Sequence, residues 1–238
     1  MNLRPSSKNV DVERLLRAVL KDEWMLKTGV GGILAATGIV AILYSFICLP
    51  LSAACVALMI GYCLRCMRVK AANPEAKLPD WNEWGDLFLS GITWIALQFG
   101  IWVFVLSLQM ILMGLAVSCA YTSSSEFLTI LWLVRACVTV SASLRFLFVL
   151  CAYTMVNFAI EENAKAGLAF AKVAQRLAAN PGKLLLGFAL AMGIQIAAVL
   201  IPCLTLVGVF LVPSAYFAGQ MVSAIVLARF WCSCRDEE

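Results

Sequence analysis

The chain of 238 residues is 63% apolar and only 13% charged, and it contains no histidine. This composition excludes a soluble domain and predicts a polytopic membrane protein. The absence of histidine excludes Ser-His hydrolases and His-ligated haem or metal sites. The net charge of +4 gathers in short clusters, so we expect it to set membrane topology rather than to bind nucleic acid.

The N-terminal 27 residues form a cytoplasmic tail and an amphipathic helix. Val12, Leu15 and Val19 recur with helical spacing, and charged side chains occupy the opposite face. This pattern predicts a helix that lies on the membrane surface, with Trp24 marking the interface. A helix packed in the cytosol is the alternative.

Six apolar runs follow, and we expect each of them to cross the membrane. They pair into three transmembrane hairpins at residues 28–68, 87–158 and 184–231. Each helix of the middle hairpin has about 30 residues, which at 1.5 Å per residue is about 45 Å, longer than the roughly 30 Å hydrocarbon core. These two helices must therefore tilt or project beyond the bilayer.

Besides the N-terminal 27 residues, three charged segments lie outside the hairpins. They are a Trp-rich hinge at residues 69–86, a second amphipathic helix at 159–183 and a tail at 232–238. Of the 18 Lys and Arg residues, 16 lie in the segments outside the hairpins or at the adjoining ends of the spans, all on one side, and only Arg135 and Arg145 lie in the interior of a span. The positive-inside rule then places both termini in the cytoplasm. The predicted fold is an all-α, polytopic bundle of six transmembrane helices with two amphipathic interfacial helices.

The hinge contains two tryptophans, Trp81 and Trp84, three residues apart. Asp80 is placed to cap a helix that starts here, with Glu83 at the capping-box position. One interpretation is an interfacial helix whose indoles lie at headgroup depth. The other is a docking surface for a cytosolic partner.

Three polar side chains are predicted near the middle of the membrane. Counted at 1.5 Å per residue from the ends of their spans, Gln98 and Gln195 lie about 18 Å from the inner edge and Arg135 about 13 Å from the outer edge. An intramembrane charge requires a partner or water, and no acid shares the depth of Arg135. Its guanidinium either extends toward the headgroups, binds an anionic ligand or lipid phosphate, or contacts another subunit.

Arg145 is predicted near the inner edge, beside the start of the preceding span. We expect it to form an interfacial ion pair with Asp86.

The ten cysteines are scattered and lie mostly in apolar runs, which is typical of small buried side chains rather than a disulfide framework. Two pairs, Cys63 with Cys66 and Cys232 with Cys234, leave a zinc site as an alternative. We expect no metal or other cofactor. A two-aspartate intramembrane protease would need acids within the spans, and none are present.

Several motifs resemble one known family. They are Trp24 with Lys27 before a Gly-rich span, Gly61-Tyr62-x-x-Arg65, Leu78-Pro79-Asp80-Trp81-x-x-Trp84-Gly85-Asp86-Leu87-Phe88, and Asn180-Pro181-Gly182-Lys183. In this combination the chain resembles the domain-of-unknown-function family DUF4013, polytopic membrane proteins of bacteria and archaea. The family commonly has an acid shortly after the Asp-Leu-Phe, where this chain has Leu89-Ser90-Gly91. The resemblance implies a bacterial or archaeal cytoplasmic membrane and brings no activity, substrate or cofactor.

We therefore expect a non-enzymatic membrane module, an accessory or assembly subunit that acts through protein contacts of the hinge and of the long middle hairpin. Its expected partners are membrane lipids and either another protein or further copies of itself. The alternative is a carrier or binding protein for an anionic solute or lipid, centred on Arg135, Gln98 and Gln195.

Overall fold

The computed structural model describes residues 24–44, 49–122, 126–204 and 211–235. Within these ranges the chain is helical and contains no strand, which confirms the all-α class. The amphipathic helix predicted before Trp24 and the final tail residues lie outside the described residues.

The long helices correspond to the six predicted spans. They are α2 (Trp24–Tyr44), α3 (Leu49–Ala72), α4 (Trp84–Thr122), α5 (Glu126–Glu161), α8 (Pro181–Cys203) and α9 (Val212–Arg235). Five of them, all except α2, are long and apolar enough to cross a membrane, whereas α2 qualifies only as a shorter apolar helix over Trp24–Val40. The chain is therefore a multi-pass membrane protein with five candidate spans among its described residues.

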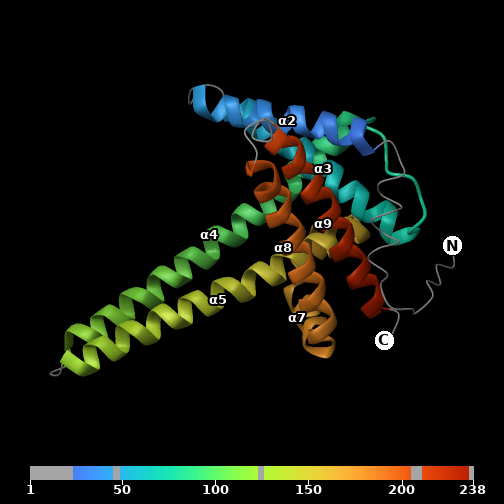
Figure 1. The fold of residues 1–238 in the computed structure, drawn as a ribbon. Helices are drawn as coiled ribbons and strands as arrows, with labels where there is room; N and C mark the ends of the chain where they lie inside the picture. The colour runs from blue at the N-terminus through green and yellow to red at the C-terminus, as the bar shows by residue number, and fades with distance from the viewer. Residues whose placement is uncertain (1–23, 45–48, 123–125, 205–210, 236–238) are drawn as a thin grey trace.

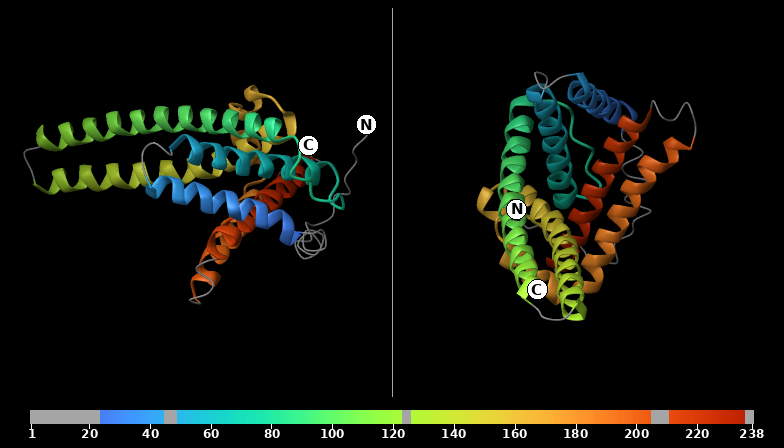
Figure 2. Two further views of the ribbon diagram at one scale, coloured as in Figure 1. Left: turned by 90° about the horizontal axis from the view of Figure 1, so that it is seen from above. Right: turned by 90° about the vertical axis from the view of Figure 1, so that its left-hand side faces the viewer.

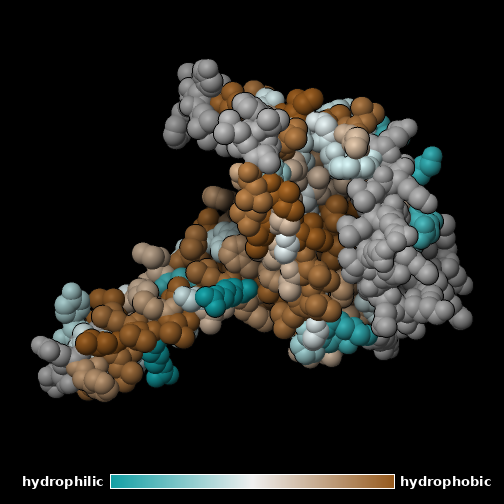
Figure 3. Space-filling model, viewed as in Figure 1, coloured by the Kyte–Doolittle hydropathy of each residue, from teal (hydrophilic) through white to brown (hydrophobic). Residues whose placement is uncertain are grey.

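The helices form a packed body and a projecting hairpin. Helices α2, α3, α8 and α9 pack together with the first part of α4 and the last part of α5 (Figure 1). Beyond the body, residues 102–122 of α4 and 126–148 of α5 run side by side as a hairpin, here called the arm (Figures 1 and 2). On the face shown in Figure 3, the surface of the arm is mostly apolar. In the most apolar stretch of α5, no residue is buried inside the protein.

Two glycines allow α3 and α4 to pack with their backbones in close contact. A Cβ on Gly61 would lie 1.9 Å from the carbonyl oxygen of Leu87, and a Cβ on Gly91 would lie 1.8 Å from that of Ala57. Neither position can therefore accept a side chain without separating the helices. This contact fixes the base of the arm against the body.

The hinge differs from the prediction. Residues 73–83 form turns and irregular backbone, and α4 begins only at Trp84. Glu83, with φ of 54°, precedes the helix, and its carbonyl oxygen accepts hydrogen bonds from the amides of Asp86 and Leu87. The predicted helix start at Asp80 is wrong because the Asp80 carboxylate pairs with Lys27 of α2, at 3.1 Å.

The second amphipathic segment is two short helices, α6 (Ala164–Gly167) and α7 (Phe170–Ala179). Helix α7 buries Val173 and Leu177 and exposes Lys172, which pairs with Glu161.

The bounds of the other helices differ from the predicted ones by a few residues. Pro213, predicted inside the last span, lies in the first turn of α9, where a missing N–H costs no helical hydrogen bond.

Candidate functional site

Charged and polar side chains join the ends of several helices into one layer, which we call the polar belt. The ion pairs of this layer link α2 to the hinge (Lys27–Asp80), α3 to the hinge (Arg65–Glu83), and α3 to the end of α5 (Arg68–Glu162). Arg68 also donates to the carbonyl of Ala159 at 3.0 Å. Three segments predicted to be cytoplasmic therefore meet at one end of the molecule.

Trp81 is half-buried, and contacts within the protein hold its ring. Its ring stacks on Tyr62 of α3, with centroids 4.0 Å apart and planes at 7°, and it also lies 5.7 Å from the Phe217 ring of α9. The indole N–H donates to the carbonyl of Lys27 at 2.9 Å, and the Lys27 ammonium donates to the carbonyl of Leu78 at 2.6 Å. We call this set the hinge clamp.

Trp84 stacks on Trp81 at 5.5 Å but leaves 45% of its surface exposed. Of the two tryptophans, it alone retains a large surface for contact with lipid headgroups or another protein.

Asp86 and Arg145 do not meet. Asp86 lines a small polar pocket between α3 and α4, together with Arg65 and Arg68. Among the described residues, no ion pair joins it to Arg145, whose side chain is exposed on α5. The predicted pair fails because α5 extends to Glu161, so that Arg145 lies well beyond the polar belt.

The length of α5 fixes the depth of its arginines. Its span of 35 residues is about 52 Å long at 1.5 Å per residue. To fit within a roughly 30 Å core, such a helix would need to tilt by about 55°, beyond the observed range of roughly 0 to 40°. Part of α5 therefore extends past a hydrocarbon core of this thickness.

Measured along α5 from Ala159 in the polar belt, Arg145 lies about 21 Å away and Arg135 about 36 Å away. On an upright helix that enters the hydrocarbon at Ala159, Arg145 would be within the hydrocarbon. Arg135 would then reach the headgroup layer of the opposite side, because a bilayer measures about 40 to 45 Å with its headgroups.

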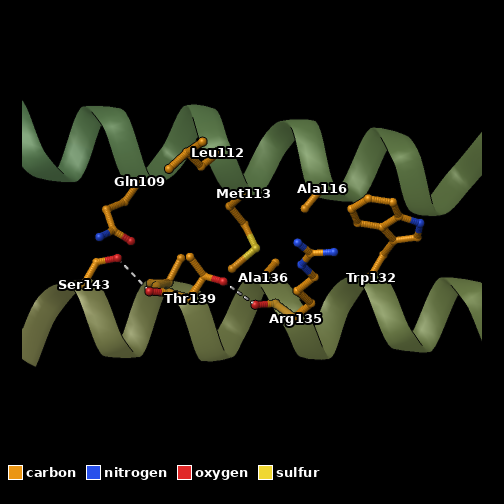
Figure 4. Close-up of a pocket in the computed structure, with 10 residues that line it drawn as sticks. Gln109, Leu112, Met113, Ala116, Trp132, Arg135, Ala136, Thr139 and Ser143 are labelled. Atoms are coloured by element: carbon orange, nitrogen blue, oxygen red, sulfur yellow. Dashed lines mark hydrogen bonds between the residues drawn. The ribbon is translucent and has the colours of Figure 1, made fainter.

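Arg135 borders a hollow of about 160 Å³ between the two helices of the arm (Figure 4). Its guanidinium lies 5.8 Å from the centre of the Trp132 ring. Within the described part of the chain, this guanidinium has no carboxylate or hydrogen-bond acceptor. It therefore remains available to an anion.

Most of the lining is apolar, and besides Arg135 its polar residues are Gln109, Thr139 and Ser143. Thr139 and Ser143 follow Arg135 at four-residue intervals on the same stripe of α5, and each hydroxyl donates to the carbonyl four residues earlier, at 2.8 and 2.7 Å. Their oxygen lone pairs can still accept from a ligand. Gln109 reaches from α4 toward Ser143 (Figure 4), and its Oε1 is buried without a hydrogen-bond partner.

The two glutamines predicted to join Arg135 lie elsewhere. The Gln98 amide is within hydrogen-bonding reach of the Cys151 thiol, near the body. Gln195 lies on α8 against Gly219 of α9, with both polar atoms of its amide buried and unpaired. The predicted depths of Gln98 and Gln195 were counted from the inner edge of a roughly 30 Å core, and that of Arg135 from its outer edge. Helices α4 and α5 are much longer than this core, so residues counted from opposite edges do not lie at the same level.

Gln109 was not predicted. A sequence signal for it does exist: Arg135, Thr139 and Ser143 form a polar stripe on one helix. Such a stripe indicates that the neighbouring helix carries a polar residue facing it.

The cysteine pairs considered for zinc are buried in the body. Among the described residues, no group of three or more His, Cys, Asp or Glu side chains is arranged to hold a metal ion.

The apolar spans and the polar belt define the class: a multi-pass helical membrane protein. The chain belongs to the family DUF4013, described as a protein of unknown function, whose model matches residues 42–212. No curated protein and no solved structure matches the chain.

Proposed function

We propose that the protein is a non-enzymatic accessory or assembly subunit of the cytoplasmic membrane, with both termini in the cytoplasm, that packs its arm against another membrane protein. The single observation that carries this proposal is Arg145, an exposed cation inside an apolar candidate span that has no acid beside it in the described structure. An intramembrane charge of this kind is costly unless a partner neutralises it.

The end of the arm supports the same proposal. Beyond the level of Arg135, large apolar side chains are exposed on both helices, among them Leu115 at 60%, Phe127 at 72% and Ile130 at 61%. We infer that this part extends past the hydrocarbon, where lipid tails would not cover it. An apolar surface exposed there favours a protein contact.

The partner we propose is a different protein whose transmembrane helix carries Asp or Glu at the depth of Arg145. A second copy does not supply this charge. The only acid in the arm is Glu126, about 29 Å from Arg145 along α5, and a copy with the same orientation keeps Glu126 at the same depth.

The experiment uses a photo-crosslinking amino acid at position 146, whose Phe is 53% exposed beside Arg145, in native membranes. We expect a crosslink to one protein segment that contains Asp or Glu, its loss in Arg145→Glu, and its recovery when that carboxylate is changed to Lys. Arg135→Gln is the matched control and keeps the crosslink. Crosslinks to lipid alone, to a second copy alone, or equally in Arg145→Glu would refute the proposal.

The second candidate function is a binding protein or carrier for an anionic solute or lipid. The observation that favours it is the unpaired Arg135 guanidinium at the hollow. Native mass spectrometry of the gently solubilised protein tests it. An anionic adduct on the wild type should be lost in Arg135→Gln and retained in Arg145→Gln.

A further inference from the structure

The lining of the hollow indicates which anion would fit, and this inference rests on the second candidate function. One end offers a guanidinium, which donates up to five hydrogen bonds and matches a phosphate. The remaining polar groups, on Thr139, Ser143 and Gln109, are placed to accept hydrogen bonds. A simple anion would pair with Arg135 and leave these acceptors unused.

We propose that the hollow binds a phosphate ester of glycerol, with the phosphate on Arg135 and the free hydroxyls donating to Thr139 and to the acceptors beyond it. Thr139 lies about 6 Å from Arg135 along the helix and Ser143 about 12 Å. A glycerol group esterified to the phosphate extends along this stripe. Its hydroxyls supply the donors that the buried Gln109 Oε1 and the two side-chain hydroxyls lack.

The depth of the site fits a lipid source for this ligand. Arg135 lies about 36 Å from Ala159 along α5, which on an upright helix that enters the hydrocarbon at Ala159 is the level of the opposite headgroup layer, where lipid phosphates are located. The shared chemistry of phosphatidylglycerol and of soluble glycerol phosphate is a glycerol phosphate ester. Both sources are therefore tested.

The test compares two lipids of equal charge and equal acyl chains on the purified full-length protein, by native mass spectrometry. Phosphatidylglycerol carries hydroxyls on its headgroup, whereas phosphatidylethanol carries none. We expect the wild type to bind phosphatidylglycerol about fivefold more tightly, as one or two additional hydrogen bonds would give. Thr139→Val and Gln109→Leu each reduce this preference while phosphatidylethanol binding stays unchanged.

Three matched variants serve as controls. Gln98→Leu and Thr122→Val change the same residue types on α4 outside the hollow, and Arg145→Gln removes the other arginine of α5. All three should keep the preference for phosphatidylglycerol. A second experiment adds soluble glycerol 3-phosphate to the lipid-bound protein. If the soluble ester displaces the lipid, and Thr139→Val weakens this displacement, the soluble ester is the ligand source. If the lipid is not displaced, the lipid is the source.

The failures are distinguishable. If Arg135→Gln weakens both lipids by at least about tenfold but the wild type does not prefer the hydroxylated one, anion binding stands and the glycerol ester is refuted. If Arg135→Gln leaves both lipids bound as before, the second candidate function fails, and this inference fails with it.

Discussion

Removing the Trp81 side chain should open the hinge clamp rather than cost the protein a partner. The indole contributes a stack on Tyr62 worth about 1 kcal/mol, a hydrogen bond to the Lys27 carbonyl worth about 1 kcal/mol, and about 1 to 2 kcal/mol of apolar burial for a partly exposed ring. Trp81→Ala should therefore destabilise the clamp by about 3 kcal/mol. Trp81→Phe keeps the stack and should cost about 1 kcal/mol.

The assay uses a thiol next to the clamp. Cys66 is fully buried beside Tyr62, so a maleimide reaches it only when this region opens. The rate of Cys66 modification, resolved by peptide mass spectrometry, should rise more than a hundredfold in Trp81→Ala and about fivefold in Trp81→Phe. Trp84→Ala is the control, because that ring is 45% exposed and should change the rate by less than about fivefold. A larger effect of Trp84→Ala than of Trp81→Ala would refute this reasoning.

Two further substitutions test the packing of the body. Gly61→Ala should cost about 1 to 3 kcal/mol, because its Cβ meets the Leu87 backbone, whereas Gly100→Ala, with no atom within 4 Å, should be neutral in the same thermal unfolding measurement. Lys27→Met should cost about 1 to 3 kcal/mol because it removes both the 2.6 Å hydrogen bond to the Leu78 carbonyl and the ion pair with Asp80, and equal melting temperatures for Lys27→Met and wild type would contradict this.

The course of the helices could be predicted from the sequence because membrane spans are defined by long apolar runs, which need no knowledge of tertiary contacts. The two charged segments between the hairpins, predicted at residues 69–86 and 159–183, were located in the same way, from the gaps between the apolar runs. Helix α2 shows the limit of this signal: its apolar described part is shorter than those of the other spans.

The start of α4 could not be predicted from local signals. Asp80 has the chemistry of a helix cap, but a lysine 53 positions earlier, Lys27, binds its carboxylate and draws it away from the helix. Capping rules describe neighbours in sequence, whereas this contact depends on how α2 packs against the hinge.

The candidate site was predicted only in part. Arg135 stands out as a charge within an apolar run, and that signal needs no structure. Its polar neighbours depend on which residues face each other across the arm, and that register brings Gln109, rather than Gln98, to the hollow.

The hinge clamp also sets an order of events during synthesis. Phe217, which completes the aromatic group around Trp81 and Tyr62, is encoded 136 positions after Trp81. At roughly 5 to 20 residues per second, the ribosome needs roughly 7 to 27 s to reach it. During that interval the loop before α4 has its contacts with α2 and α3 but lacks those of the last helix. The body is therefore completed only when the C-terminal hairpin inserts, and a nascent chain stopped before α9 leaves one face of this aromatic group uncovered.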